Sequence, residues 1–229
     1  MSKKSRIAHI VNSVVELRGY TINTGFDHLL SKIHYNPRLI QLPFLFRYIR
    51  DSPASVVDIG CSESMAPVQL SMMGYDVTGI DIRDYKYTHE HFTFIKDDFV
   101  EHGFSKKFDI AVNISAIEHF GLQTYGTIKA DPAADLKAMR KIHAMLKPGG
   151  QLIFTSPYGL HEIVGTFERV YDEEDLKKLF RGFRILNKEY YKVVKYRQIE
   201  RINQEQASRM KHMNDTYAVV LVNAQKTKL

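Results

Sequence analysis

Short apolar segments that alternate with helical ones constrain the fold of this chain more than any other feature. Between residues 55 and 155, five segments are nearly continuous apolar runs: 55–59, 75–81, 92–95, 108–113 and 151–155. Segments 66–73 and 135–146 have the apolar spacing of helices. Apolar strands separated by helices are typical of a parallel sheet with helices on both faces. We therefore predict a doubly wound α/β domain over residues 51–229.

The two ends of the chain depart from this alternation. Residues 1–50 contain three amphipathic stretches, and we predict an N-terminal helical segment that caps the active site. Near the C-terminus, 172–180 is predicted as a helix with Asp172 as its N-cap, and 183–194 and 217–222 as strands. The polar, basic stretch 195–215 is expected to be a lid or insertion, with a solvated helix or disorder as the alternatives.

Composition narrows the class of protein. A single cysteine, Cys61, excludes a disulfide framework and favours a reducing compartment. No apolar run approaches the roughly 20 residues that span a membrane, so we expect a cytoplasmic protein. The net charge of +6 is distributed as +6 over residues 1–50, −9 over 51–175 and +9 over 176–229. The basic flanks favour an anionic acceptor or partner, whereas solvated helix faces are the plain alternative.

Polar residues follow the apolar segments, where parallel sheets bind their ligands. These positions are rich in hydrogen-bond acceptors: Asp58 with 60–64, Asp81, Asp97, Asp98, Asn113 and Ser156. Neither a P-loop motif nor a Gly-x-Gly-x-x-Gly fingerprint is present. The pattern therefore favours a ligand with hydroxyl groups and a positive centre over a phosphate.

Five segments in order then resemble the motifs of the class I S-adenosylmethionine-dependent methyltransferases. They are Val56-Val-Asp-Ile-Gly-Cys-Ser-Glu-Ser, Gly79-Ile-Asp-Ile-Arg, Phe94-Ile-Lys-Asp-Asp-Phe, Phe108-Asp-Ile-Ala-Val-Asn-Ile-Ser-Ala-Ile-Glu-His-Phe and Leu146-Lys-Pro-Gly-Gly. The Glu118-His-Phe-Gly stretch further resembles a poorly characterised bacterial-type branch that we associate with surface-polysaccharide or sugar-metabolite genes. Members often carry Gly-x-Gly-x-Gly in the first motif, but Ser62 and Ser64 replace two of these glycines here.

The resemblance implies a fold and a cofactor site. It implies a Rossmann-like, mostly parallel seven-stranded sheet with an antiparallel C-terminal strand. It also implies that S-adenosylmethionine is bound by Asp58, Gly60, Cys61, Ser62, Asp81, Ile82, Asp98, Phe99, Asn113 and Ile114. Asp58 and Gly60 would frame the methionine end, Asp81 the ribose hydroxyls, Ile82 the adenine face and Asp98 the adenine amino group.

The same resemblance places the chemistry after the fourth strand. His119 is the candidate general base, because histidine titrates near neutrality, and Glu118 is expected to orient it or to contact the acceptor. Tyr125, Tyr158, His161 and the loop 121–132 are expected to line the acceptor pocket, and Arg169 and Tyr171 to reach an anionic acceptor.

Binding a metal ion is the alternative role for Glu118 and His119. Some members of the superfamily bind a divalent ion through Glu-x-x-Glu-His, but Ser115 occupies the first position here. Glu118 and His119 alone are too few ligands unless His161 or Glu162 joins them, so we expect no catalytic metal.

The leading interpretation is therefore methylation of an oxygen, or less readily a nitrogen, on a small-molecule or saccharide-like acceptor. The first alternative is an RNA methyltransferase that uses the basic flanks. The second alternative is a protein that binds S-adenosylmethionine without catalysis.

Overall fold

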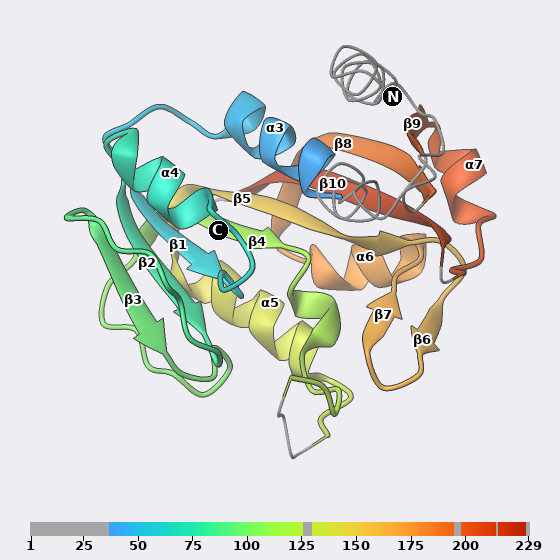
Figure 1. The fold of residues 1–229 in the computed structure, drawn as a ribbon, viewed down its shortest axis with the longest axis horizontal. Coiled ribbons are helices and arrows are strands. Elements are labelled where there is room, and N and C mark those ends of the chain that lie inside the picture. Colours follow the sequence, from blue (N-terminus) through green and yellow to red (C-terminus); the bar gives the residue numbers. More distant parts are fainter. Residues whose placement is uncertain (1–36, 126–129, 195–197, 214, 228–229) are drawn as a thin grey trace, which may run out of the picture.

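The computed structural model describes residues 37–125, 130–194, 198–213 and 215–227. The first two amphipathic stretches predicted within residues 1–50 lie outside these residues. The third corresponds to helix α3 (Arg38–Tyr48), which covers the sheet (Figure 1). No helix in the described ranges combines the length and the apolarity that crossing a membrane would need.

The main sheet confirms the predicted α/β class and has eight strands in the order β3-β2-β1-β4-β5-β10-β8-β9. The strands are β1 (Ser55–Ile59), β2 (Asp76–Asp81), β3 (Phe92–Lys96), β4 (Phe108–Ile114), β5 (Leu146–Tyr158), β8 (Phe183–Val194), β9 (Gln198–Ile202) and β10 (Thr216–Lys226). β1 to β5 are parallel, and β10 is antiparallel to both β5 and β8. The sequence predicted seven strands, and the eighth is β9, which pairs antiparallel with β8.

Helices cover both faces of this sheet (Figure 1). α3 and α4 (Ala66–Met72) pack on one face, where Val56 and Ile153 join their hydrophobic cluster. α5 (Ala134–Met145) and α6 (Glu173–Leu179) pack on the other face, with Val57 and Leu152. Neighbouring strand residues therefore enter opposite cores, which explains why these strands are continuously apolar in sequence.

The predicted N-cap of α6 is present. The Asp172 side chain accepts a hydrogen bond from the Asp175 backbone N–H, and the Asp175 side chain accepts one from the Asp172 backbone N–H. This capping box satisfies two backbone donors that a helix start leaves unpaired.

Two parts of the C-terminal half were not predicted as strands. A small antiparallel hairpin of β6 (Glu162–Val164) and β7 (Glu168–Val170) projects beyond the main sheet (Figure 1). The stretch 195–215, expected to be a lid or insertion, contains the edge strand β9 and the short helix α7 (Gln204–Ser208). None of the described residues 198–213 lines the cavity described below.

Candidate active site

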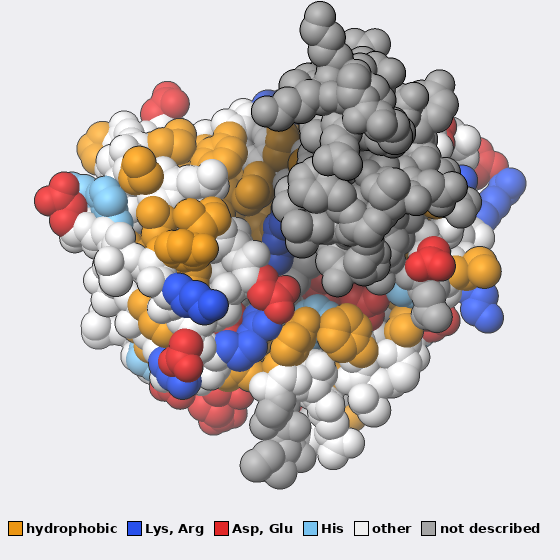
Figure 2. Space-filling model, viewed as in Figure 1, with side chains coloured by type: hydrophobic (Ala, Val, Ile, Leu, Met, Phe, Trp, Pro, Cys, Tyr) orange, Lys and Arg blue, Asp and Glu red, His pale blue; other side chains and the backbone are white. Residues whose placement is uncertain are grey.

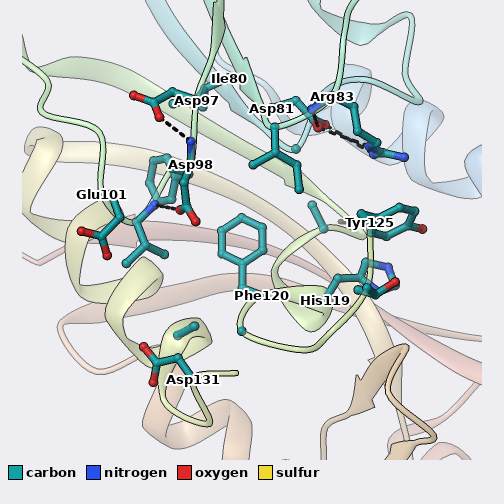
Figure 3. A pocket seen from close by; sticks show the side chains of 18 of the residues that line it. Ile80, Asp81, Arg83, Asp97, Asp98, Glu101, His119, Phe120, Tyr125 and Asp131 are labelled. Atoms are coloured by element: carbon teal, nitrogen blue, oxygen red, sulfur yellow. Dashed lines mark hydrogen bonds and ion pairs between the residues drawn. The ribbon is translucent and has the colours of Figure 1, made fainter. Parts of the chain in front are cut away.

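A cavity of about 900 Å³ lies at the carboxyl ends of the parallel strands (Figure 3). It opens where β1 has β2 on one side and β4 on the other, so that the strand order reverses. Open α/β sheets bind their ligands at such a reversal. Its walls come from the ends of β1, β2, β3 and β4 and from the segments 119–125 and 130–137.

Gly60 forms the floor of the cavity at the end of β1. Its φ is +74°, a left-handed conformation that glycine adopts without steric cost. A Cβ at this position would lie 2.2 Å from the Cβ of Ala116, which follows β4. The turn after β1 and the turn after β4 therefore approach each other so closely that only glycine fits.

Asp81 lines the cavity from the end of β2, and its carboxylate is already hydrogen-bonded. Oδ2 accepts from the Ser62 backbone N–H at 2.9 Å, and Oδ1 accepts from the Arg83 backbone N–H at 2.9 Å. The Arg83 guanidinium also lies 3.3 Å from Oδ1 and 4.2 Å above the Tyr125 ring (Figure 3). Any ligand hydroxyl that binds Asp81 has to share it with Arg83.

The adenine-side residues of the prediction also line the cavity. Ile82 is an exposed apolar side chain that follows Asp81. The Asp98 carboxylate, labelled in Figure 3, accepts from the Val100 backbone N–H at 2.7 Å. Phe99 contributes to the wall but packs mainly into the core. Asp97 lies at the rim, where Oδ2 is 2.8 Å from Nδ1 of His102.

Five predicted cofactor residues do not line the cavity: Ser62, which donates its backbone N–H to Asp81, and four residues that lie behind the wall. Asp58, Cys61, Asn113 and Ile114 are all buried, and Ser115 and Ala116 present the surface after β4 instead. The amide of Asn113 donates to the Ile59 carbonyl, so this side chain braces β1 against β4.

Asp58 stands out among these buried residues. Its Oδ2 has no hydrogen-bond partner within the described parts of the chain. Burial raises the pKa of Asp58 to about 7, and the charge of Arg38 opposes this rise. A buried carboxyl with a spare acceptor suits a positively charged ligand group nearby.

The short 3-10 helix η1 (Ile117–His119) directs His119 to the cavity and leaves Glu118 buried. His119 lines the cavity, and its Nδ1 lies 2.6 Å from the Phe167 carbonyl, which can only accept a hydrogen bond. Nδ1 therefore carries the proton and Nε2 the lone pair. Burial lowers the pKa of His119, which keeps the imidazole neutral at pH 7. Glu118 is buried, and burial raises its pKa to about 8.

Four residues expected around the acceptor are placed elsewhere. Tyr158 and Tyr171 are fully buried in the core. His161 pairs with Asp175 on α6. Arg169 is 4% exposed and donates to the Phe120 carbonyl, so it holds the segment after η1 and reaches no acceptor. These side chains do not line the cavity because Tyr158 and His161 are directed to α6, and Arg169 and Tyr171 to Asp135 of α5. Tyr125 does line the cavity.

Sequence reasoning missed three residues of this site. Arg38 of α3 reaches the cavity and donates to the Ile114 carbonyl at 2.8 Å. Arg83 stands only two residues after Asp81, a proximity that could have indicated the ion pair. Glu168 of β7 comes within 4.8 Å of Glu118 and His119, and no local pattern marks it in the sequence.

The cavity has an acidic lining. Six Asp and Glu side chains line it, against three Arg and Lys. On the described part of the face in Figure 2, basic side chains are interspersed with acidic ones, and hydrophobic side chains gather over α4. The negative middle of the sequence thus coincides with the cavity, which favours a ligand with positive charge and hydroxyl groups.

The fold and the position of the cavity define the chain as one with the Rossmann-like fold of the class I S-adenosylmethionine-dependent methyltransferases. It is similar to the Burkholderia thailandensis 1,6-didemethyltoxoflavin-N1-methyltransferase with bound 1,6-didemethyltoxoflavin and S-adenosylhomocysteine. The identity is 16%, the match covers 91% of this chain and 93% of that one, and the TM-score is 0.55.

Two further structures share the fold. NodS from Bradyrhizobium japonicum WM9, an N-methyltransferase in complex with S-adenosylhomocysteine, is 14% identical over 84% of this chain and 89% of that one, with a TM-score of 0.57. The (4+2)-cyclase SpnF is 16% identical over 96% and 95%, with a TM-score of 0.56. Identities this low show a common fold, which different reactions can use.

The family comparison is more specific. The family described as "Caenorhabditis protein of unknown function, DUF268" matches residues 71–224, and the chain belongs to this family. No curated protein matches the sequence significantly. The resemblance to a branch with the Glu-His-Phe-Gly motif stays a prediction.

Proposed function

We propose that the protein is an S-adenosylmethionine-dependent methyltransferase that acts on a small molecule. The observation that carries this proposal is the acidic cavity at the strand-order reversal, lined by Gly60, Asp81, Asp98 and His119. Neighbours of the same fold have been crystallised with S-adenosylhomocysteine, which supports the same cofactor here.

The lining residues fit this cofactor by their chemistry. Asp81 would accept from the ribose hydroxyls, Asp98 from the adenine amino group, and Ile82 would pack on the adenine face. Gly60 lines the cavity beside the place for the methionine end, and Asp58 offers a buried acceptor behind it. When bound, the cofactor supplies an electrophilic methyl group on a sulfonium. The protein's part is to place the acceptor and to remove its proton.

His119 is the residue best suited to remove that proton. Its Nδ1–H is held by the Phe167 carbonyl, so Nε2 can accept a proton in a fixed orientation. Burial keeps the ring neutral, and a positioned base of this kind contributes about 10²–10⁴-fold to the rate. Contacts with Tyr125 and Phe167, at ring distances of 5.2 and 4.7 Å, further restrict the imidazole.

The volume of the cavity supports a small acceptor. About 900 Å³ is within the roughly 300–1,000 Å³ of small-molecule sites, enough for a nucleoside-sized cofactor and a compact second ligand. A neutral imidazole base favours an acceptor hydroxyl, because a hydroxyl is a weak nucleophile until its proton is removed, whereas a neutral amine attacks through its own lone pair. The comparisons give no support for a saccharide or an RNA acceptor.

Calorimetry with S-adenosylhomocysteine tests the proposal directly. We expect micromolar-range binding, a loss of at least tenfold in Asp81→Ala, and unchanged binding in Asp84→Ala. Asp84 is a suitable control because it is exposed and pairs with Lys96. No binding at millimolar ligand would refute the proposal.

A labelled-methyl transfer screen over small phenols, nucleotide sugars and total RNA then separates catalysis from binding alone. Transfer to a small molecule supports the proposal, and His119→Ala should lower turnover more than cofactor affinity. Tight binding without transfer to any acceptor would favour a non-catalytic role, as the shared fold of a cyclase allows.

A further inference from the structure

Three potential metal ligands converge at one side of the cavity. Glu118 and His119 belong to η1, and Glu168 is the first residue of β7. One ligand atom from each lies within 4.8 Å of the other two. His119 also lines the cavity, so the cluster is at its wall.

His119 and Glu168 are each oriented by a partner outside the cluster. The Phe167 carbonyl accepts from Nδ1 of His119, which leaves Nε2 as the ligand nitrogen. Nε2 of His212 lies 3.0 Å from Oε1 of Glu168. Metal-bound histidines and carboxylates generally have such outer partners, which fix the tautomer and the direction of the ligand atom.

The buried carboxylate of Glu118 supports a cation site independently of the spacing of the three side chains. Glu118 is 1% exposed, and its Oε2 has no hydrogen-bond partner among the residues that the structure describes. The nearby guanidinium of Arg169 is directed to backbone carbonyls of residues 118 and 120 instead. A buried acceptor of this kind beside a second carboxylate is costly unless a cation or a proton joins them.

The ligand set indicates which cation fits. Carboxylates suit Mg²⁺, Ca²⁺ and Mn²⁺, whereas imidazole suits Zn²⁺, Fe²⁺ and related ions. Two carboxylates with one imidazole therefore match Mn²⁺ or Zn²⁺ best. Three protein ligands leave coordination positions open, as in metal sites that bind a water or a substrate.

We propose that Glu118, His119 and Glu168 form a divalent-cation site of the Mn²⁺ or Zn²⁺ class at the wall of the cavity. The third ligand comes from β7, not from His161 or Glu162, the two residues that the sequence suggested. His161 pairs with Asp175, and Glu162 accepts from the His212 backbone N–H. An ion bound at Nε2 would occupy the lone pair that a general base uses, so His119 would serve as a ligand and not as the base whenever the cation is bound.

The test measures cation binding to the full chain without any cofactor, so its outcome does not depend on the proposed methyltransferase activity. Mn²⁺ is titrated up to about 1 mM and its free concentration is read from the electron paramagnetic resonance signal. We expect about one saturable site per chain, at least tenfold weaker binding in Glu118→Gln and in Glu168→Gln, and competition by Zn²⁺.

Glu63→Gln is the matched control. Glu63 lines the cavity with its carboxylate paired to Arg83, outside the cluster. This variant should bind Mn²⁺ as the wild type does, and circular dichroism confirms that each variant is folded. An absence of saturable binding would overturn the proposal. Equal binding by the wild type and both cluster variants, or equal loss in Glu63→Gln, would overturn it as well.

Discussion

Replacing Gly60 with alanine tests how closely the turns after β1 and β4 must approach. The change has two costs. A left-handed φ costs a residue with a Cβ about 1–2 kcal/mol. The new Cβ would also lie 2.2 Å from the Cβ of Ala116, where ordinary carbon contacts are about 3.5–4.0 Å. Relief requires a shift of more than about 1 Å in buried backbone, and overpacking of this kind costs about 1–3 kcal/mol.

Gly165→Ala is the matched control. Gly165 has a φ of +59° in the turn between β6 and β7, and a Cβ there would meet no atom within 4 Å. This variant should lose only the conformational cost of about 1–2 kcal/mol. Gly60→Ala should lose about 2–5 kcal/mol, the same cost plus the steric one.

Urea unfolding followed by far-ultraviolet circular dichroism measures both losses, since the chain has no tryptophan to report by fluorescence. Calorimetry adds a second readout: Gly60→Ala should weaken S-adenosylhomocysteine binding, and Gly165→Ala should leave it unchanged. Equal losses of unfolding free energy in the two variants would refute the reasoning, because the approach of the two turns would then cost nothing.

Three further predictions concern charged residues near the sheet. Because the folded state raises the pKa of Asp58 to about 7, it binds this proton more tightly than the unfolded state does. The contribution of Asp58 to the unfolding free energy of the unliganded protein should therefore fall as pH rises from about 4 to 7, by on the order of 4 kcal/mol. In urea titrations Asp58→Asn should remove this part of the pH dependence and leave the part that comes from Glu118, whose pKa is also raised. Burial acts to raise the pKa of Asp109, but Lys147 and further hydrogen bonds lower it to about 2. Its contribution is present above the unfolded pKa near 4 and lost as pH falls toward 2, so Asp109→Asn should cost about 1 kcal/mol at pH 7 and nothing at pH 2. Arg83→Gln frees the Asp81 carboxylate and should tighten S-adenosylhomocysteine binding about fivefold in calorimetry; weaker binding would show that Arg83 helps to hold the ligand.

The parallel strands and their polar ends could be predicted from the sequence because the signals are local. Each of β1 to β4 is a mostly apolar segment with a polar side chain at its last or second-last position. Gly60, Asp81 and Asp98 follow directly from this pattern, since parallel strands of one sheet present their carboxyl ends on the same edge. Their role in cofactor binding stays a prediction until ligand binding is measured.

The edge strand β9 and the β6–β7 hairpin have no apolar pattern that predicts them from the sequence. β9 has five residues, of which none is fully buried, and β6 and β7 have three each. A strand of three residues is too short to show an apolar alternation, and the partly exposed β9 does not need one, so these sequences resemble those of loops. The expected lid at 195–215 therefore includes an edge strand that no periodicity indicated.

What the sequence by itself determined is the doubly wound sheet and the edge of that sheet where the cavity lies. Only the tertiary structure brought Glu168 of the β6–β7 hairpin beside Glu118 and His119, and only it placed the Arg83 guanidinium on Asp81. The physical reason is that the sequence signals are local, whereas these contacts depend on the tertiary packing. Apolar periodicity reports burial within one element, whereas the partner of a charged side chain depends on how distant elements pack and on which polar atoms that packing leaves unpaired.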